Sequence, residues 1–483
     1  MIIRFATVLS LLTVSMSTQA QQPTPAQPTA AAQPATPPRP AFAQRKVELT
    51  QYPATPVPDR IILSIGANPA TTMGVNWRTD TTVTAGYAEI KIATAAPEAS
   101  DAVRIPSVVT PLLLEDSRAH YHELTFTNLQ PETLYMYRVG DSVNRSEWVQ
   151  FRTAATTFKP FAFLYFGDAQ NDHKTWWSRT IRAAGQRQPD AAFMLHAGDL
   201  INRTNVDTEW GEWFYAGGWL HSMIPALPTP GNHEYYRDDN RKLTLTKHWR
   251  PLFNMPLNGP AGLEEVAYYV DYQQVRIISL SSQALLLNPT DSISQVKWLE
   301  EVLQNNPQQW TILTMHHPVF STGEGRDNES LRNAFQPLFE KYHVDLVLTG
   351  HDHTYGRGID ETSPHTKKTA LKGPVYVVSV SGPKMYVHSL KPWLQRAAVN
   401  TQLYQRVIVE EKKLRMESYT VAGELYDAFD IVKKGNGKKE LIDWAPGLTK
   451  EKLELPETYR NRFTQQEKAA YEKRKKDYLD RKQ

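Results

Sequence analysis

Cysteine is absent from all 483 residues of this chain. Its absence excludes disulfide bonds, thiolate metal ligands and a cysteine nucleophile, so stability has to come from burial rather than from cross-links. Long apolar runs are also scarce. After the N-terminus, no segment reaches the roughly 18 uncharged apolar residues that a membrane-spanning helix needs. The sequence therefore predicts no transmembrane segment.

The N-terminus has the pattern of a cleaved export signal. Residues 1–20 read MIIRFATVLSLLTVSMSTQA, in which Arg4 precedes a short apolar core and a small-residue cleavage site ends at Ala20. Residues 21–46 are rich in proline, alanine, glutamine and threonine. This composition predicts an extended linker, because such a segment buries too little surface to offset its ordering entropy. We expect an exported protein, either periplasmic or secreted.

Residues 47–156 consist of short alternating segments. Stretches such as TMGVNWRT, YAEIKIA and HYHELTFTNL place apolar or β-branched residues at every second position, which is typical of half-buried antiparallel strands. About seven such strands in about 100 residues predict a β-sandwich. The run from Leu129 to Val139, LQPETLYMYRV, resembles the corner strand of fibronectin type III domains, and Trp77 is a candidate core tryptophan. A generic antiparallel sheet is the alternative.

Residues 157–430 alternate apolar strands with helical stretches, which indicates a layered α/β domain with a largely parallel sheet. Five of the predicted strands end in polar clusters: FAFLYFGD, AAFMLHAGDL, IPALPTPGNHE, TILTMHHP and VDLVLTGHDH. In such sheets ligands collect outside the carboxyl ends of the strands. Two later segments, GPVYVVSVSG and LYQRVIVEEKKLRMESY, are expected to be strands that complete the second half of the sheet.

The polar residues at these strand ends form a set of metal-ion donors. Carboxylate, amide and imidazole groups suit zinc, manganese and iron, and the set is too large for one tetrahedral ion. Two ions about 3.5–4 Å apart that share one carboxylate would use it fully. Helix capping is the alternative for the two aspartates, since each precedes a helical stretch. The set is Asp168, Asp199, Asn232, His233, His316, His317, His351 and His353.

The order of the motifs GDAQ, GDLIN, GNHE, MHHP and GHDH resembles that of the calcineurin-like metallophosphoesterases. The β-sandwich in front makes the chain most similar to the purple acid phosphatases. The resemblance covers about residues 55–425 and implies a phosphoesterase domain built as a β-sheet sandwich flanked by helices. It implies two divalent ions (iron, manganese or zinc) with Asp168 and His353 on the first, Asn232, His316 and His351 on the second, and Asp199 bridging both.

Two further histidines adjoin the implied ligands. By resemblance, His233 is not a ligand but faces the substrate phosphate, where it either stabilises the transition state or protonates the leaving oxygen. His317 has no fixed role: it orients His316, contacts substrate or is structural. Glu234 and Asp352 are expected to support neighbouring ligands or to pack.

Two positions depart from the family pattern. The purple acid phosphatases carry a tyrosine three residues after the bridging aspartate, where it binds ferric iron and gives the colour; this chain has Asn202. Related phosphoesterases often place a histidine two residues after the first aspartate; this chain has Gln170. Either amide oxygen is a candidate additional metal ligand, and a neutral donor of this kind favours divalent manganese, zinc or ferrous iron.

The implied chemistry is hydrolysis of small phosphate monoesters by a metal-activated water, without a covalent enzyme intermediate. Monoester and diester activities share the same core ligands, so a phosphodiesterase acting on nucleotides or lipid headgroups is the alternative. A binding protein with an inert phosphatase fold is disfavoured, because all seven expected metal and catalytic positions are present.

Residues 431–483 form a charged tail. From Lys433 onward, 15 Lys and Arg face 9 Asp and Glu, so the overall net charge of +3 belongs to the tail. The rest of the chain has no broad basic surface of the kind that nucleic-acid tracking needs. Thr464 and Glu467 form a capping box that predicts a terminal helix. We expect this helix to present a solvated basic face, with binding to an acidic surface as the alternative.

Overall fold

The computed structural model describes residues 51–360, 366–435 and 437–482. The predicted signal segment (residues 1–20) and the whole of the predicted linker (residues 21–46) therefore lie outside the described residues. Within the described ranges, no helix has both the length and the apolar character that crossing a membrane requires.

Two antiparallel sheets pack face to face in the N-terminal domain, as the alternating pattern predicts. Trp77 is fully buried between them and stacks on His122 with 5.0 Å between ring centroids. At the predicted corner, the backbone N–H of Gln130 donates to the Tyr135 hydroxyl at 2.8 Å. One sheet holds β1 (Asp59–Ser64), β2 (Met73–Thr79), β6 (Arg118–Phe126) and β5 (Val108–Leu113), and the other holds β4 (Val103–Pro106), β3 (Tyr87–Ile92), β7 (Leu134–Gly140) and β8 (Val149–Arg152). The prediction of a β-sandwich is confirmed.

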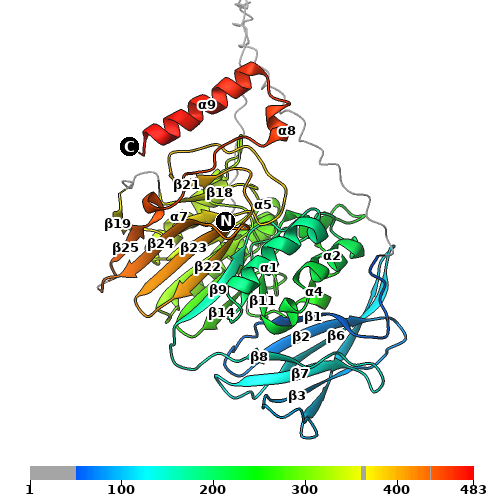
Figure 1. Cartoon of the computed structure of the whole chain (residues 1–483). Coiled ribbons are helices and arrows are strands. Elements are labelled where there is room, and N and C mark those ends of the chain that lie inside the picture. The colour runs from blue at the N-terminus through cyan, green and yellow to red at the C-terminus, as the bar shows by residue number, and fades with distance from the viewer. Residues whose placement is uncertain (1–50, 361–365, 436, 483) are drawn as a thin grey trace, which may run out of the picture. The chain divides into compact units, whose positions relative to one another are not determined.

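The α/β part that follows has two halves, each with its own sheet. In the first half, β9 (Phe161–Phe166), β10 (Met194–His196) and β11 (Ala226–Pro228) are parallel neighbours. Figure 1 shows two of its helices, α1 and α2, in front of these strands. The helical segments are η1 (His173–Trp177), α1 (Ser178–Arg187), α2 (Asp207–Gly217), α3 (Leu220–Met223), η2 (Asn232–Glu234) and α4 (Trp249–Leu252), and a small hairpin is formed by β12 (Tyr235–Arg237) and β13 (Leu243–Leu245).

The second half contains a seven-stranded sheet whose central strands are parallel. Its strands, in spatial order, are β14 (Tyr268–Tyr272), β15 (Val275–Leu280), β16 (Trp310–Met315), β17 (Leu346–Thr349), β20 (Val375–Val378), β18 (Tyr355–Gly358) and β21 (Leu394–Ala398). Its helices are α5 (Ser282–Leu287), α6 (Pro289–Gln304) and α7 (Glu329–Lys341). The prediction of a layered α/β domain with parallel strands is confirmed.

One strand assignment is wrong. The segment LYQRVIV forms β22 (Leu403–Val409), which pairs antiparallel with β9 of the first half instead of completing the second. The strands β23 (Lys413–Thr420), β24 (Leu425–Lys433), β25 (Lys439–Asp443) and β19 (Lys368–Leu371) extend the same sheet. Only β20 joins the second half as expected. An apolar strand pattern indicates burial but does not say which sheet provides the partner, so the pattern of β22 fits either sheet.

The sandwich and the first half share one twelve-stranded sheet. β1 pairs in parallel with β11 through Ser64 and Ala226. Beside this junction, Asp207 at the start of α2 accepts hydrogen bonds from Arg60 (2.7 and 2.8 Å) and from Arg78 (3.1 Å). All three side chains are buried. Because an unpaired buried charge is strongly destabilising, these pairs fix α2 against the sandwich.

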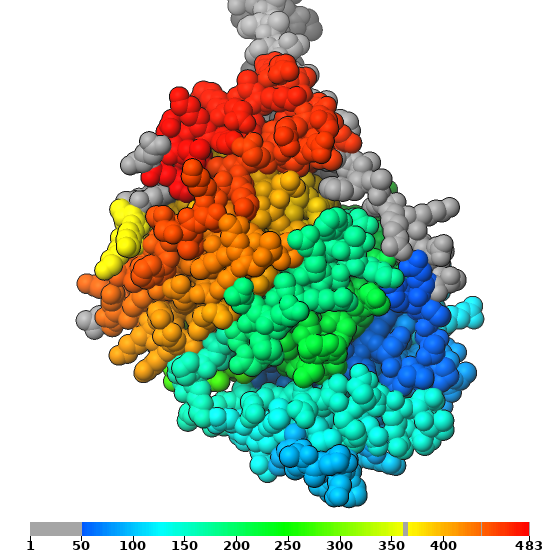
Figure 2. Space-filling view, in the orientation of Figure 1, coloured from blue at the N-terminus to red at the C-terminus, as the bar shows by residue number. Residues whose placement is uncertain are grey.

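The C-terminal tail folds onto the second half. It contains η3 (Ala445–Gly447), α8 (Glu457–Arg460) and α9 (Gln465–Asp480). The predicted capping box is confirmed, since Thr464 and Glu467 satisfy each other's backbone N–H groups. The helix presents the expected solvated basic face, on which Lys473 and Lys476 are exposed. It is also anchored, because Tyr471 and Tyr478 are buried in the core of the second half. Figure 2 shows this segment, in red, lying directly on the orange and yellow residues.

Candidate metal centre

The loops that follow five parallel strands bring the sequence-predicted ligands together. The ends of β9, β10 and β11 supply Asp168, Asp199 and Asn232, whereas the ends of β16 and β17 supply His316, His351 and His353. Three of these residues have backbone φ angles in the left-handed region: Asp199 (51°), His351 (72°) and His353 (49°). Residues other than glycine adopt this conformation at a cost, and such strain is concentrated at functional sites.

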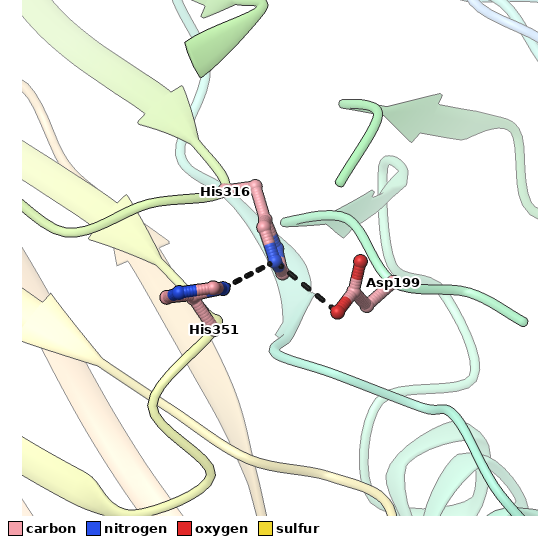
Figure 3. Close-up of side chains that lie close together, drawn as sticks. All are labelled: Asp199, His316 and His351. Carbon is pink, nitrogen blue, oxygen red and sulfur yellow. Dashed lines mark hydrogen bonds and ion pairs between the residues drawn. The ribbon is translucent and has the colours of Figure 1, made fainter. Parts of the chain in front are cut away.

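One group of donors gathers around His316. Its Nε2 lies 3.2 Å from Asp199 Oδ2 and 3.1 Å from Asn232 Oδ1. His351 Nδ1 lies 3.0 Å from the same Asn232 oxygen and 3.1 Å from His316 Nε2. Figure 3 shows His316 between Asp199 and His351, with its ring aimed at both. Four side chains that each offer a lone pair thus converge on one point.

A second group shares Asp199 with the first. Asp168, Asp199 and His353 are all buried, and their ligand atoms lie within 4.8 Å of one another, as do those of Asp199, His316 and His351. His353 Nε2 is 3.1 Å from Asp168 Oδ2. The geometry therefore contains two donor groups joined by a single carboxylate, which is the arrangement that a binuclear centre requires.

Two histidine nitrogens and one carboxylate oxygen are available to bind a cation. His316 Nδ1 donates to the carbonyl of Ala197 and His353 Nδ1 donates to that of Lys384, both at 2.9 Å, which leaves the two Nε2 lone pairs for a metal. Asp168 Oδ2 is buried and makes no hydrogen bond within the described residues. Burial, together with the charge of Asp199, raises the pKa of Asp168 to about 7. A bound cation would relieve this unfavourable burial, so the residues fit a metal centre.

The glycines of the motifs are explained by the close approach of the carboxylates. A Cβ on Gly350 would lie 2.2 Å from Asp168 Oδ1, and a Cβ on Gly231 would lie 2.2 Å from Asp199 Oδ1. The same Oδ1 atoms accept backbone N–H groups, at 2.6 Å from His351 and 2.9 Å from His233. Each aspartate is therefore held by Oδ1, and its Oδ2 faces the other donors. Neither aspartate is a helix N-cap, since Asp172 precedes η1 and Val206 precedes α2.

His233 lies beside the cluster but in neither ligand group. Its Nδ1 donates to the carbonyl of Asn202 at 2.5 Å, and its Nε2 is 3.9 Å from Asp199 Oδ2. The side chain is 26% exposed, whereas that of His316 is fully buried. One nitrogen is thus fixed by the protein, and the other is directed at the cluster and accessible to solvent.

The two positions that depart from the family pattern differ in placement. Gln170 is fully buried, and its amide nitrogen lies 2.7 Å from Asp199 Oδ2 and 3.1 Å from His353 Nε2. Asn202 acts through its backbone instead: its N–H donates to Glu209 at 2.8 Å and its carbonyl holds His233. Its amide makes no hydrogen bond within the described part of the chain. The structure brings Gln170, rather than the side chain of Asn202, against the predicted ligands.

Two buried residues support the ligands from behind. His317 Nδ1 lies 2.9 Å from Ser282 Oγ, and its ring is 4.0 Å from the ring of His351, measured between centroids. Burial, aided by the charge of His316, lowers the pKa of His317 to about 3, so the ring packs as a neutral group. Glu234 accepts the backbone N–H groups of Asp199 (2.9 Å) and Gly231 (2.6 Å), and so ties two ligand loops together.

Three further residues lie beside the cluster, and no sequence motif indicates them. Arg326 Nη1 donates to the His351 carbonyl at 2.9 Å. The ring of Tyr386 lies 4.6 Å from that of His353, and Lys384 Nζ is 3.4 Å from Gln170 Oε1. They stand in the stretches GEGRDN and GPKMY, whose only local signal is the glycine or proline of a loop.

Comparisons with known proteins agree with this geometry. Residues 162–355 match the calcineurin-like phosphoesterase family, and residues 58–153 match the N-terminal domain of purple acid phosphatases. Both ranges lie within the predicted domains, whose outer bounds remain predictions. Purple acid phosphatase 21 of Arabidopsis thaliana is 28% identical over 271 residues, which are 54% of this chain and 58% of that one. Purple acid phosphatase 1 of Ipomoea batatas is 26% identical over 262 residues, which are 52% and 54%.

The chain thus spans under two thirds of the length of these curated relatives. Among solved structures, a purple acid phosphatase from yellow lupin seeds aligns with a TM-score of 0.66 at 18% identity, over 79% of this chain and 75% of that one. This likeness concerns the fold alone.

Proposed function

Because this chain is a calcineurin-like metallophosphoesterase with a purple acid phosphatase N-terminal domain, we propose that it is an exported phosphatase that hydrolyses small phosphate monoesters. The observation that carries the proposal is the pair of donor groups joined through Asp199. Export is proposed from the pattern of residues 1–20.

Each residue of the centre has a proposed task. Asp168 and His353 hold the first ion, His316, His351 and Asn232 hold the second, and Asp199 holds both. When bound, two divalent ions (manganese, zinc or iron) neutralise phosphate charge and lower the pKa of a bound water. Gln170 would place a neutral amide next to the first ion. The purple acid phosphatases instead place a phenolate there, from the position that corresponds to Asn202.

His233 is proposed to act on the substrate. Its Nδ1 is committed to the Asn202 carbonyl, so only Nε2 can contact a phosphate ester bound at the cluster. A proton held on Nε2 can stabilise the transferring phosphoryl group or pass to the leaving oxygen. Its Nε2 atom lies 3.9 Å from Asp199 Oδ2, and His233 belongs to neither donor group. This supports a place near the ligands but not a role as a ligand.

The proposed function is tested by metal analysis coupled to hydrolysis. The protein is freed of metal, reloaded with manganese, zinc or iron, and assayed on 4-nitrophenyl phosphate and on bis(4-nitrophenyl) phosphate. We expect two ions per chain and faster turnover of the monoester. A clear preference for the diester would show that the enzyme is a phosphodiesterase and not a phosphate monoesterase. Stoichiometric metal without hydrolysis of either ester would refute both.

Iron-loaded protein is expected to be colourless. The colour of purple acid phosphatases is charge transfer from a tyrosinate to ferric iron, and this chain has Asn202 at the matching position. The hydroxyls of Tyr165 and Tyr355 are committed to Thr349 and Asp427. An absorption spectrum of protein loaded with ferric iron checks this expectation. A strong visible band that disappears in Tyr386→Phe would show that a different phenolate binds the iron.

A further inference from the structure

Lys384 places an ammonium beside the proposed metal ligands. Its Nζ lies 3.4 Å from Gln170 Oε1, and the amide of Gln170 contacts Asp199 and His353. No carboxylate pairs with this ammonium within the residues that the structure describes. The position is unfavourable in a metal-loaded centre, because a cation next to two further cations is repelled. An anion bound there would offset the repulsion.

Arg326 places a second cation near the same ligands. Asp352 fixes it, accepting from Nη1 at 2.9 Å, while the same nitrogen donates to the His351 carbonyl. Asp352 is fully buried and also accepts from Ser321 (2.6 Å) and Gly323 (3.0 Å), so the carboxylate and its loop are held rigidly. Nε and Nη2 of Arg326 have no acceptor among the described residues, and the side chain is 21% exposed. Three of its five N–H groups are therefore available to a ligand.

The ring of Tyr386 lies near both cations. Arg326 Cζ lies 4.9 Å from the centroid of its ring and Lys384 Nζ lies 5.5 Å from it, while the ring also packs on the ligand His353. Both cations therefore lie near the ring that packs on His353, whereas the Nε2 atom of His233 lies 3.9 Å from Asp199 Oδ2. The transferring phosphoryl group has the metal ligands and His233 for partners, so the two cations remain for a different anionic group.

Two carboxylates lie near this pair of cations: Asp352 forms an ion pair with Arg326, and Asp168 interacts electrostatically with Lys384 but is a proposed metal ligand. Glu324 is engaged by Arg474 in an ion pair of 2.5 Å. Tyr459 of α8 faces Tyr386 and Arg326, and burial, together with Tyr386, raises the pKa of Tyr459 to about 12, so its hydroxyl is neutral. Asp352 is balanced by Arg326. The ammonium of Lys384 and the free edge of Arg326 are left to attract an anion.

We propose that Lys384 and Arg326 form a second anion subsite beside the metal centre, so that the preferred substrates are phosphate esters whose alcohol part carries a further anionic group. This inference rests on the proposed function and specifies its substrate class. A carboxylate can accept hydrogen bonds from Nη2 and Nε of Arg326 or from Nζ of Lys384, and such charge-assisted bonds are stronger than neutral ones.

Two matched esters test the subsite. 4-Carboxyphenyl phosphate and 4-carbamoylphenyl phosphate have the same shape and differ in one negative charge. The ratio of their kcat/KM values is measured for the metal-loaded wild type, for Lys384→Gln and for Arg326→Lys. Lys297→Gln is the matched control, since Lys297 is 79% exposed on α6. Metal content is measured for every variant.

We expect the wild type to prefer the carboxylate ester, and Lys384→Gln to reduce this preference about 10- to 100-fold, the effect of losing one hydrogen bond to a charged group. Lys297→Gln is expected to keep the wild-type ratio. An equal loss for both esters would assign Lys384 to the transferring phosphoryl group and overturn the subsite, as would a wild type without preference.

A binding measurement separates failure of the subsite from failure of the proposed function. Phosphonoacetate and methylphosphonate are not hydrolysed, and calorimetry gives their dissociation constants on metal-loaded protein. We expect phosphonoacetate to bind more tightly, and Lys384→Gln to remove the difference. If neither ester is hydrolysed but phosphonoacetate still binds more tightly and Lys384→Gln removes the difference, the phosphatase assignment is refuted and the subsite is supported. Equal affinity of the two phosphonates for the wild type would refute the subsite, whatever the enzyme hydrolyses.

Discussion

Asp199→Asn is expected to release both metal ions and to abolish hydrolysis. Asp199 is the one residue common to both donor groups, and it is fully enclosed by the structure. An asparagine has the same shape but no charge, and a neutral amide bridges two dications poorly. Since metal coordination supplies several kcal/mol of transition-state stabilisation, its loss costs on the order of 10⁴-fold in rate or more. Metal analysis and kcat/KM on 4-nitrophenyl phosphate measure the two effects.

The control for this variant is Asp190→Asn, an aspartate exposed on the loop between α1 and β10. The Asp190→Asn variant loses the same negative charge at a site away from the proposed ligands. It should retain two ions and full activity. Circular dichroism of Asp199→Asn establishes that its fold is kept. If Asp199→Asn binds two ions and turns over substrate normally, the bridging assignment is wrong.

His233→Ala is expected to keep both ions and to slow turnover about 10²- to 10⁴-fold, the usual range for losing a positioned acid or base. Both ions should stay bound because His233 lies outside both donor groups. Turnover should slow because its Nδ1 is held by the Asn202 carbonyl and its Nε2 is directed at the cluster. If His233 protonates the leaving oxygen, the loss should be larger for phenyl phosphate than for 4-nitrophenyl phosphate, whose leaving group needs no proton. Steady-state kinetics on the two esters give this comparison.

His343→Ala is the matched control for that experiment, because His343 is exposed and lies at the end of α7. It should behave as the wild type on both esters. Loss of one metal ion in His233→Ala would make His233 a ligand. Equal slowing of the two esters would instead favour stabilisation of the phosphoryl group over proton donation.

The gathering of the donor side chains was predictable from sequence because its information is local. Each donor follows an apolar strand and most follow a glycine, and the structure shows why: a Cβ on Gly231 or Gly350 would collide with a ligand carboxylate. The capping box of Thr464 and Glu467 is equally local, since two residues three positions apart satisfy each other. Such signals do not depend on the rest of the chain.

The features that sequence analysis missed depend on tertiary contacts. The partner of β22 is β9, more than 200 residues earlier, and no pattern within β22 encodes that choice. Lys384 and Arg326 have ordinary loop sequences around them, and their position near His353 follows only from the folded chain. Asn202 was considered for its side chain, but its contact with His233 uses the backbone carbonyl, which every residue type has.

The N-terminal sandwich adjoins the first half of the α/β part directly, because the two share the twelve-stranded sheet. β1 pairs with β11 at one position, Ser64 with Ala226, and Arg60 and Arg78 neutralise Asp207 at the start of α2. A chain that begins after the sandwich would leave β11 at the edge of its sheet and would leave Asp207 without Arg60 and Arg78. Exposed edges of this kind invite pairing with other chains. We therefore expect the first half of the α/β part to lose solubility when the sandwich is removed, although the sandwich contributes no residue to either donor group.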